Sequence, residues 1–298
     1  MNNIFASTTF LPNGTSVFEA IALLESVGIT QVELGSSHRE ESDLLERLKR
    51  TSGRFLTHNF FPPGSREMII NLGSSNQVVR EKSLDFVKGA LEFGECLGAE
   101  LYTVHPGFVD DPISESVSLN DGRYDFKFPE RSRAAHESRV SDRKRCVELF
   151  QASIEQIAPF LRGKRIRLGV ETQGSVGQAD NVIFSHPNEI LEMATRWLPM
   201  NIGVNLNLGH LNLSASVSGF DKFDFVERLK PFVLGVEVSH NEGVLDDHKA
   251  LEKDGWYLQA LSDSFFSKIP VIFEGRFEPL ERVAESCQLL NLIWAGRE

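Results

Sequence analysis

The stretch Val-Leu-Gly-Val-Glu-Val-Ser-His, residues 233–240, is a short run of apolar and β-branched residues that ends on polar ones. Such a run predicts a buried β-strand. Similar runs recur along the chain, and each is followed by a longer segment with helical spacing. The predicted strands span residues 3–9, 31–35, 54–60, 100–105, 165–171, 201–207, 233–240 and 270–274.

The segments between these runs predict helices that alternate with the strands. They lie near residues 16–27, 40–50, 76–98, 137–161, 187–197, 221–230, 256–267 and 278–291. This alternation over 298 residues predicts an α/β fold, a single (β/α)8 TIM barrel domain spanning 1–298. The alternative is an open doubly wound sheet, which a glycine-rich phosphate-binding motif after the first strand would favour. The sequence there, Phe-Leu-Pro-Asn-Gly at residues 10–14, contains no such motif.

Composition and charge narrow the class of protein. Hydrophobic residues make up 41% and charged residues 24% of the chain, as in ordinary globular proteins. The net charge of −11 provides no general attraction for nucleic acid, so we expect a small-molecule partner, although net charge does not show where the charges lie. The sequence contains no apolar run long enough for a membrane span.

The cysteines and the first residues of the chain indicate the cellular compartment that we expect for the protein. Cys96, Cys146 and Cys287 are far apart and odd in number, which predicts reduced thiols in a cytoplasmic protein rather than a disulfide framework. The first residues, Met-Asn-Asn-Ile-Phe, lack the features of a signal peptide. The apolar helix faces give no signal about oligomeric state.

One connection, residues 108–137 after the fourth strand, is unusually long and has no clear periodicity. Loops of this length are often lids or binding loops, so it is a candidate lid. Residues 120–145 carry eight basic and five acidic side chains, which favours an anionic group nearby. Arg131 and Arg133 are the candidate substrate-binding residues. The alternative is a solvated loop and a charged helix face.

Polar residues gather where the predicted strands end, and in a parallel barrel these ends share one face. A single histidine there is more often structural, but five of the eight histidines fit this pattern. Imidazoles and carboxylates together suit Zn²⁺, Mn²⁺, Fe²⁺ or Co²⁺ better than Ca²⁺. The candidate metal ligands are His58, His105, Glu171, Asn207, His210, His240, Asp246, His248 and Glu274.

Several short motifs resemble the xylose isomerase-like TIM-barrel superfamily, which includes endonuclease IV. The resemblance extends from about residue 54 to 275. It rests on His58, Ile-Asn-Leu-Gly-Ser-Ser (70–75), Glu-Lys-Ser (81–83), Val-His-Pro-Gly (104–107), Gly-Val-Glu-Thr-Gln-Gly (169–174), Asn-Leu-Asn-Leu-Gly-His (205–210), Val-Ser-His-Asn-Glu-Gly (238–243), Asp-Asp-His (246–248) and Ile-Phe-Glu-Gly (272–275).

Likeness to endonuclease IV implies three metal ions. The first would be held by His58, His105 and Glu171, the second by Glu171, Asn207, His240 and Glu274, and the third by His210, Asp246 and His248. Likeness to the sugar isomerases implies one ion, on the second of these sets. In that case Glu171 and Glu274 would pass a proton across the substrate, and His210 would contact it.

The chain also departs from endonuclease IV. Asn207 stands where an aspartate is usual, and a neutral amide is a poorer ligand than a carboxylate. The segments Phe-Ala-Ser-Thr-Thr-Phe (5–10) and Gly-Ser-Ser-His-Arg-Glu-Glu (35–41) do not resemble its DNA-contacting segments.

These observations leave three hypotheses. The first is a metal-dependent isomerase or epimerase of a sugar or sugar phosphate, with one to three Zn²⁺ or Mn²⁺ ions. The second is an endonuclease IV-like multi-metal phosphodiester hydrolase, favoured by His58, His105 and the Asp246–His248 pair. The third is a barrel that kept the fold and lost the site, which only Asn207 supports.

Overall fold

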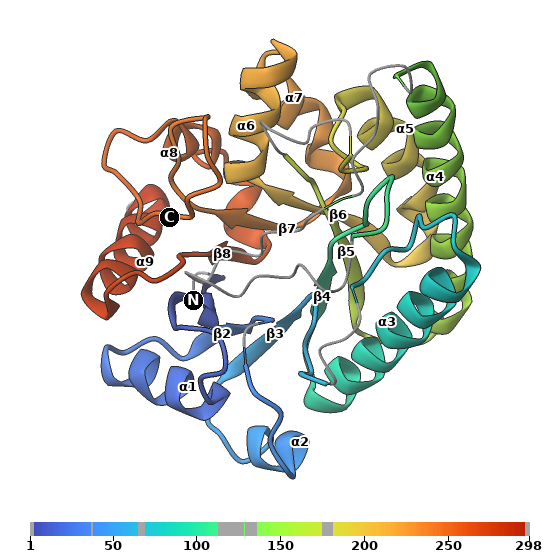
Figure 1. Ribbon diagram of the computed structural model, residues 1–298. Coiled ribbons are helices and arrows are strands. Elements are labelled where there is room, and N and C mark those ends of the chain that lie inside the picture. Colours follow the sequence, from blue (N-terminus) through green and yellow to red (C-terminus); the bar gives the residue numbers. More distant parts are fainter. Residues whose placement is uncertain are drawn as a thin grey trace.

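Eight parallel strands close into a barrel in the order β1 to β8 (Figure 1). The computed structural model describes residues 3–36, 38–64, 69–112, 128, 136–174 and 181–295, with only the backbone for 136–141 and 198. The pairing of Ile4 with Val271 closes the barrel between the first and last strands. The strands are β1 (Ile4–Ser7), β2 (Gln31–Leu34), β3 (Arg54–His58), β4 (Leu101–Val104), β5 (Arg167–Glu171), β6 (Ile202–Asn207), β7 (Val233–Val238) and β8 (Val271–Phe273).

Helices surround the barrel (Figure 1), which confirms the predicted (β/α)8 fold. Polar caps begin several of them: Ser16 accepts a hydrogen bond from the backbone of Phe18, and Asn76 accepts one from Val78. The α-helices are α1 (Val17–Ser26), α2 (Leu44–Leu48), α3 (Gln77–Leu97), α4 (His136–Ile157), α5 (Pro187–Trp197), α6 (Leu208–Ser218), α7 (Lys222–Leu229), α8 (Trp256–Ala260) and α9 (Leu280–Trp294). Short 3₁₀ segments are η1 (Thr8–Phe10), η5 (Ala158–Leu161), η6 (Leu198–Met200), η7 (Lys230–Phe232) and η8 (Phe266–Lys268).

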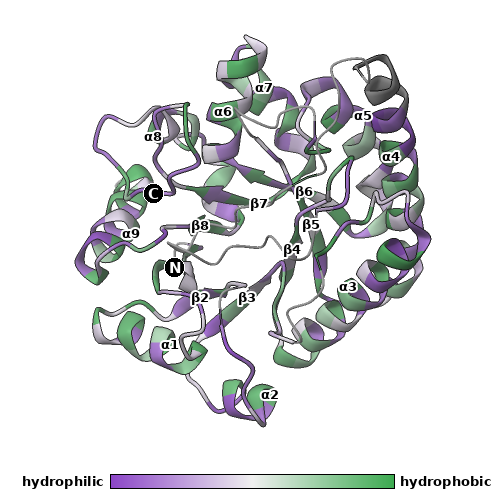
Figure 2. Ribbon diagram, viewed as in Figure 1, coloured by the Kyte–Doolittle hydropathy of each residue, from purple (hydrophilic) through white to green (hydrophobic). Residues whose placement is uncertain are grey.

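Two hydrophobic clusters hold this arrangement together. The larger one joins the strands to the inner faces of the helices, and hydrophobic and hydrophilic segments accordingly alternate along the helices (Figure 2). The smaller one fills the inside of the barrel and consists of Phe5, Leu56, Leu101 and Ile272, with Leu234 packed against them. The site therefore sits above a closed apolar floor.

Alternation along the strands places polar groups directly above this floor. Side chains two residues apart on a strand share a face. His58 therefore follows Leu56 on the inner face of β3, and Glu274 follows Ile272 from β8. The barrel interior changes from apolar to polar within one such step toward the carboxyl ends of the strands.

The sequence pattern did not predict one helix of the structure. Residues 208–218, for which the spacing predicted no helix, form α6 directly after β6. Its apolar residues do not lie along one stripe, because this helix is buried on more than one side, and the pattern expected of a surface helix is missing.

The connection after β4 runs to the start of α4 at His136. Most of the predicted loop 108–137 lies outside the described residues, and so do the candidate substrate-binding residues Arg131 and Arg133. The prediction of a lid therefore stays a prediction. All three cysteines are free thiols. Within the described part of the chain, no helix is both long and apolar enough to cross a membrane.

Candidate metal centre

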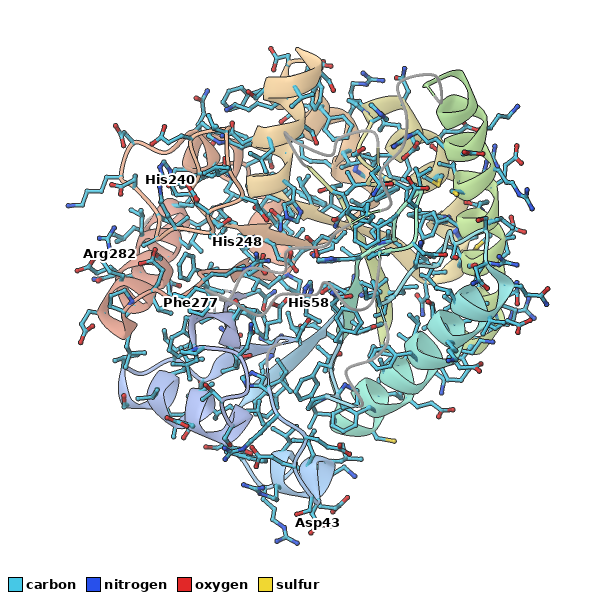
Figure 3. The ribbon with its side chains drawn as sticks, viewed as in Figure 1. Asp43, His58, His240, His248, Phe277 and Arg282 are labelled. Atoms are coloured by element: carbon cyan, nitrogen blue, oxygen red, sulfur yellow. The ribbon has the colours of Figure 1, made fainter. Side chains whose placement is uncertain are left out.

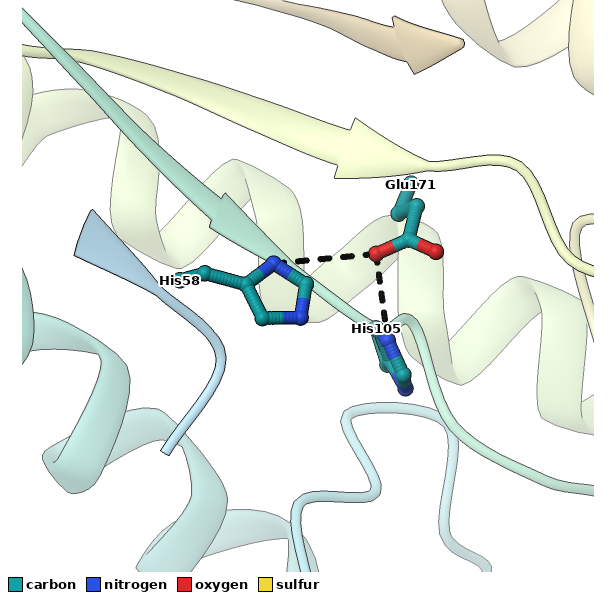
Figure 4. Close-up of side chains that lie close together, drawn as sticks. All are labelled: His58, His105 and Glu171. Atoms are coloured by element: carbon teal, nitrogen blue, oxygen red, sulfur yellow. Dashed lines mark ion pairs between the residues drawn. The ribbon is translucent and has the colours of Figure 1, made fainter. Parts of the chain in front are cut away.

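The first ligand group consists of His58, His105 and Glu171 at the ends of three neighbouring strands (Figure 4). Nε2 of His105 lies 3.0 Å from Oε2 of Glu171, and Nδ1 of His58 lies 3.8 Å from the same oxygen. This oxygen is buried and makes no hydrogen bond of good geometry. A buried carboxylate oxygen of this kind is costly unless a cation or donor completes it, so the group fits a divalent ion. We call it the first triad.

The second ligand group consists of His210, Asp246 and His248 and is called the second triad. His210 comes from the first turn of α6, and the other two residues come from the loop after β7. Nε2 of His248 lies 2.9 Å and Nε2 of His210 lies 3.4 Å from Oδ2 of Asp246. Two imidazoles and one carboxylate are a common ligand set for Zn²⁺ and related ions.

The other nitrogen of each ring in the second triad is held by an acceptor. Nδ1 of His210 donates to the carbonyl oxygen of Thr172 at 2.9 Å. Nδ1 of His248 lies 3.1 Å from Oε2 of Glu274. A metal-binding histidine usually has its second nitrogen anchored in this way, because the anchor selects the tautomer with a free Nε2 lone pair. The second triad therefore also fits a divalent ion.

The two triads meet at Glu171. Its Oε2 belongs to the first triad, while its Oε1 lies 3.0 Å from Nδ1 of His210. The side chains of His105 and Asp246 keep 25% and 32% of their surface exposed, so both triads open toward the barrel mouth. An external molecule can reach them from there.

Between the triads, three carboxylates converge on the amide of Asn207. Its Nδ2 donates to Oε1 of Glu171 at 3.1 Å, to Oε2 of Glu237 at 3.0 Å and to Oε2 of Glu274 at 3.4 Å. Its Oδ1 accepts the backbone N–H of His210 at 3.0 Å and caps α6. The residues at this central position thus contact one another rather than leaving ligand atoms free.

Glu33 and Glu237 are buried acidic residues that the sequence analysis did not select. With His58 they form a third group of ligand-type side chains in the described residues. Both lie in the middle of apolar strand sequence and are fully buried, which is rare for glutamate and was the available signal. Oε1 of Glu237 lies 3.3 Å from Nδ1 of His58, whereas Glu33 makes no well-formed hydrogen bond.

The neighbouring carboxylates raise the pKa values of three histidines in the centre. Burial lowers the pKa of each imidazole, but the acidic neighbours outweigh it. Glu237 holds the pKa of His58 well above its ordinary value, and Asp246 does the same for His210. Asp246 also helps to raise the pKa of His248 to about 9, against burial. In the metal-free protein these rings are therefore protonated at neutral pH.

The pKa values of the carboxylates in the centre shift in different directions. Burial raises the pKa of Glu171, but His105 holds it well below its usual range. Glu274 behaves alike, since His248 lowers its pKa to about 2 against the effect of burial. Burial and a neighbouring carboxylate raise the pKa of Glu33 well above its usual range. Glu33 is accordingly a neutral acid, while the other two are ionised.

His240 lies apart from both triads. β7 ends at Val238, and His240 pairs through its backbone with Lys249 in the following loop. Its ring contacts Glu242, 3.2 Å from Nε2, and Tyr257, whose hydroxyl lies 3.4 Å from Nδ1. Figure 3 shows His240 on the side of α8, whereas His58 and His248 lie nearer the middle of the barrel. The side chain from β7 that reaches the centre is Glu237 instead.

The motifs after β3 and β4 form a hydrogen-bond network next to the first triad. Oδ1 of Asn71 accepts the backbone N–H of Phe108 at 3.0 Å, and its Nδ2 donates to the carbonyl oxygen of Phe108 at 3.0 Å. The backbone N–H of Asn71 donates to Oγ of Ser83 at 2.9 Å. This network fixes the chain that follows His105. The motif residues here are therefore structural.

Gly107 is the tightest point of this network, and its replacement by alanine should be strongly destabilising. Its φ is +123°, and an added Cβ would overlap Oδ1 of Asn71. We expect Gly107→Ala to lower the free energy of unfolding by about 3 kcal/mol or more. Gly89→Ala is the matched control, because a Cβ there meets nothing within 4 Å inside α3. Denaturant unfolding of both variants tests this, and equal stabilities would contradict it.

Comparison with known proteins agrees with this architecture. A structure described as a D-tagatose 3-epimerase-like protein superposes with a TM-score of 0.70 at 18% identity, covering 98% of this chain and 97% of the other. Endonuclease IV from Thermus thermophilus gives 0.60 at 18% identity, with 98% of both chains covered. The IOLI protein with a bound zinc atom gives 0.62 at 14% identity, covering 98% of this chain and 96% of the other. At these identities the likeness shows the fold.

Sequence comparison identifies the family. The uncharacterized protein MJ1311 of Methanocaldococcus jannaschii is 22% identical over 183 residues, 60% of this chain. The match spans only half the length of that relative. Residues 21–291 match the family described as xylose isomerase-like TIM barrel, which is most of the chain. The protein therefore belongs to the xylose isomerase-like TIM barrel family.

Proposed function

We propose that the protein is a metal-dependent enzyme that hydrolyses a small phosphate ester, with one divalent ion, Zn²⁺ or Mn²⁺, at each triad. The observation that carries this proposal is the pair of triads themselves, each made of two histidines and one carboxylate and joined through Glu171. Divalent ions there would act as Lewis acids toward phosphoryl oxygens and would lower the pKa of water.

The protein's own groups would have distinct tasks in this reaction. His58, His105 and Glu171 would hold one ion. His210, Asp246 and His248 would hold the other. Glu274 would orient His248 through Nδ1, 3.1 Å away. Glu171, Glu274 and His210 were predicted from the sequence to be catalytic. In this reaction Glu171 and His210 would be metal ligands, and Glu274 would be a positioning group.

Arg276 supports an anionic substrate. It follows Glu274 at the barrel mouth, and its guanidinium nitrogens lie 4.0 Å from Asp246 and from Glu274. These contacts are too long for hydrogen bonds, so its donors remain available to a phosphate. The net charge of −11 disfavours a polyanion such as DNA, and a small phosphate ester fits both observations.

The second candidate is a sugar isomerase or epimerase, the function that sequence analysis ranked first. Its support is that Glu171 and Glu274 both accept a hydrogen bond from Nδ2 of Asn207, so both carboxylates reach the same central position. The ligand set implied for it includes His240, whose ring contacts Glu242 and Tyr257 instead. Because His240 is separated from the other ligands of this set, we rank the isomerase below the hydrolase.

The test is a paired assay on purified protein loaded with Zn²⁺ or Mn²⁺. Hydrolysis of 4-nitrophenyl phosphate and bis(4-nitrophenyl) phosphate is followed by absorbance. Exchange of solvent deuterium into ketohexoses and their phosphates is followed by NMR. We expect metal-dependent release of 4-nitrophenol that EDTA removes. Deuterium exchange without any phosphate release would favour the isomerase instead.

A further inference from the structure

We propose that the amide of Asn207 replaces a metal ion at the centre, so that the protein binds two ions per chain and none between them. The inference rests on the proposed function for the two outer ions and deepens it. The resemblance to endonuclease IV implies an ion on Glu171, Asn207, His240 and Glu274. The residues present do not fit that ion, because the ring of His240 contacts Glu242 and Tyr257 and the amide of Asn207 faces the centre with its nitrogen.

The orientation of Asn207 is imposed from outside the site. Its Oδ1 accepts the backbone N–H of His210 at 3.0 Å and so caps α6. Rotation of the amide by 180° would leave this N–H facing an NH₂ group and would lose the cap, which is worth about 1 kcal/mol. It would also turn Oδ1 toward three carboxylates. Nδ2 therefore faces the centre, and an amide nitrogen that carries two hydrogens has no lone pair for a metal.

The three carboxylates at the centre are held by this nitrogen. Nδ2 lies 3.0 to 3.4 Å from one oxygen each of Glu171, Glu237 and Glu274. The position where a shared cation would bind these oxygens is thus taken by a hydrogen-bond donor. All four residues are buried to 97% or more, which leaves little room for rearrangement.

Glu237 is also satisfied without a metal. Its Oε1 accepts from Nδ2 of Asn205 at 2.7 Å, and its Oε2 accepts from Nδ2 of Asn207 at 3.0 Å. Nδ1 of His58 lies 3.3 Å from the same Oε1. The third group of ligand-type residues, Glu33, His58 and Glu237, shares His58 with the first triad, and we assign Glu237 to support of that ring.

Charge balance agrees with two ions. Glu33 is neutral, so the buried centre contains up to four negative charges, on Glu171, Glu237, Glu274 and Asp246. Two divalent ions provide four positive charges once the histidines are neutral ligands. A third divalent ion would leave a buried excess of positive charge, which is costly.

The experiment counts metal ions per chain in the wild type and in Asn207→Asp. Aspartate keeps one oxygen for the cap of α6 and turns the other, now a ligand, toward the centre. Proteins are saturated with Zn²⁺ alone, desalted and analysed by elemental mass spectrometry and native mass spectrometry. We expect about two ions in the wild type, as the two triads imply, and one more in Asn207→Asp.

Asn205→Asp is the matched control. Asn205 lies two residues earlier on β6, is equally buried and also donates to Glu237. This change adds the same charge, but the described contacts of the Asn205 side chain include neither Glu171 nor Glu274. We expect no additional ion. Circular dichroism confirms that each variant is folded, and Asn207→Ser, which keeps a capping oxygen, is measured if Asn207→Asp is not.

The outcomes separate this inference from the proposed function. Three ions in the wild type, or two in both the wild type and a folded Asn207→Asp, would overturn the inference while leaving the two-triad hydrolase intact. Asn207→Ser removes the amide nitrogen from the central position, so a third ion in this variant supports the inference, and a count that stays at two contradicts it. No ions in the wild type would overturn the proposed function, and the inference with it.

Discussion

Glu171→Gln is expected to abolish hydrolysis while the barrel stays folded. The carboxylate of Glu171 belongs to the first triad through Oε2 and contacts His210 through Oε1. Glutamine has the same shape, so packing is retained, but it is neutral and places an NH₂ group on one side. The first ion loses its only charged ligand. We expect kcat/KM for 4-nitrophenyl phosphate to fall by about 10³-fold or more, since one lost charge-stabilising group already costs about 10²–10³-fold.

Metal content and a distant variant complete this test. The count should fall by about one ion, because the second triad does not include Glu171. Glu95→Gln is the control: this glutamate accepts backbone hydrogen bonds from Arg165 and Ile166, away from the triads. It should keep full activity and both ions. Wild-type activity in a folded Glu171→Gln protein would remove the shared basis of both enzyme hypotheses.

Metal affinity at the second triad is expected to rise steeply with pH. In the metal-free protein Asp246 keeps His210 protonated at neutral pH and raises the pKa of His248 to about 9, despite burial. Both rings must be neutral to bind an ion, so binding releases two protons. Affinity should then increase about 100-fold per pH unit, tenfold for each proton, and the contribution of His248 should level off above about pH 9.

Competition with a coloured chelator between about pH 6 and 9 measures this slope. Calorimetry in two buffers of different ionisation enthalpy counts the released protons directly. Asp246→Asn should reduce both the affinity and the number of protons released, because the carboxylate that raises both pKa values is gone. An affinity independent of pH would contradict the assignment of these histidines as ligands.

The stability of the metal-free protein should decrease with rising pH, in the opposite direction to the metal affinity. A histidine whose pKa is raised by folding contributes stability that is present below its unfolded value of about 6.5. This contribution disappears as pH rises through the folded value, about 9 for His248. Alkaline pH therefore destabilises the metal-free protein, whereas it increases the affinity of the second triad for a metal ion. Thermal unfolding of the chelator-treated protein across this pH range measures the effect.

Much of the fold could be predicted because strand and helix patterns are local. The predicted run 54–60 contains β3, and the predicted run 201–207 contains β6. The missed helix α6 lacks a single apolar stripe, so its periodicity carried no signal.

Strand alternation also explains which ligand predictions the structure groups together. Glu237 and Gly235 share the inner face of β7, whereas His240 falls on the other parity beyond the end of the strand. Glu237 therefore reaches Asn207, whereas the ring of His240 contacts Glu242 and Tyr257.

The sequence by itself determined the barrel, the face on which polar residues gather and the residue types available there. These follow from alternation along each strand and from the order of strands and helices, which are short-range properties. Only the tertiary structure decided how those residues combine. Glu237 reaches Asn207 because β6 and β7 pair in one register, and Asn207 faces the centre with its nitrogen because its oxygen caps α6. Such choices depend on contacts between distant segments, and they determine which candidate ligands lie together.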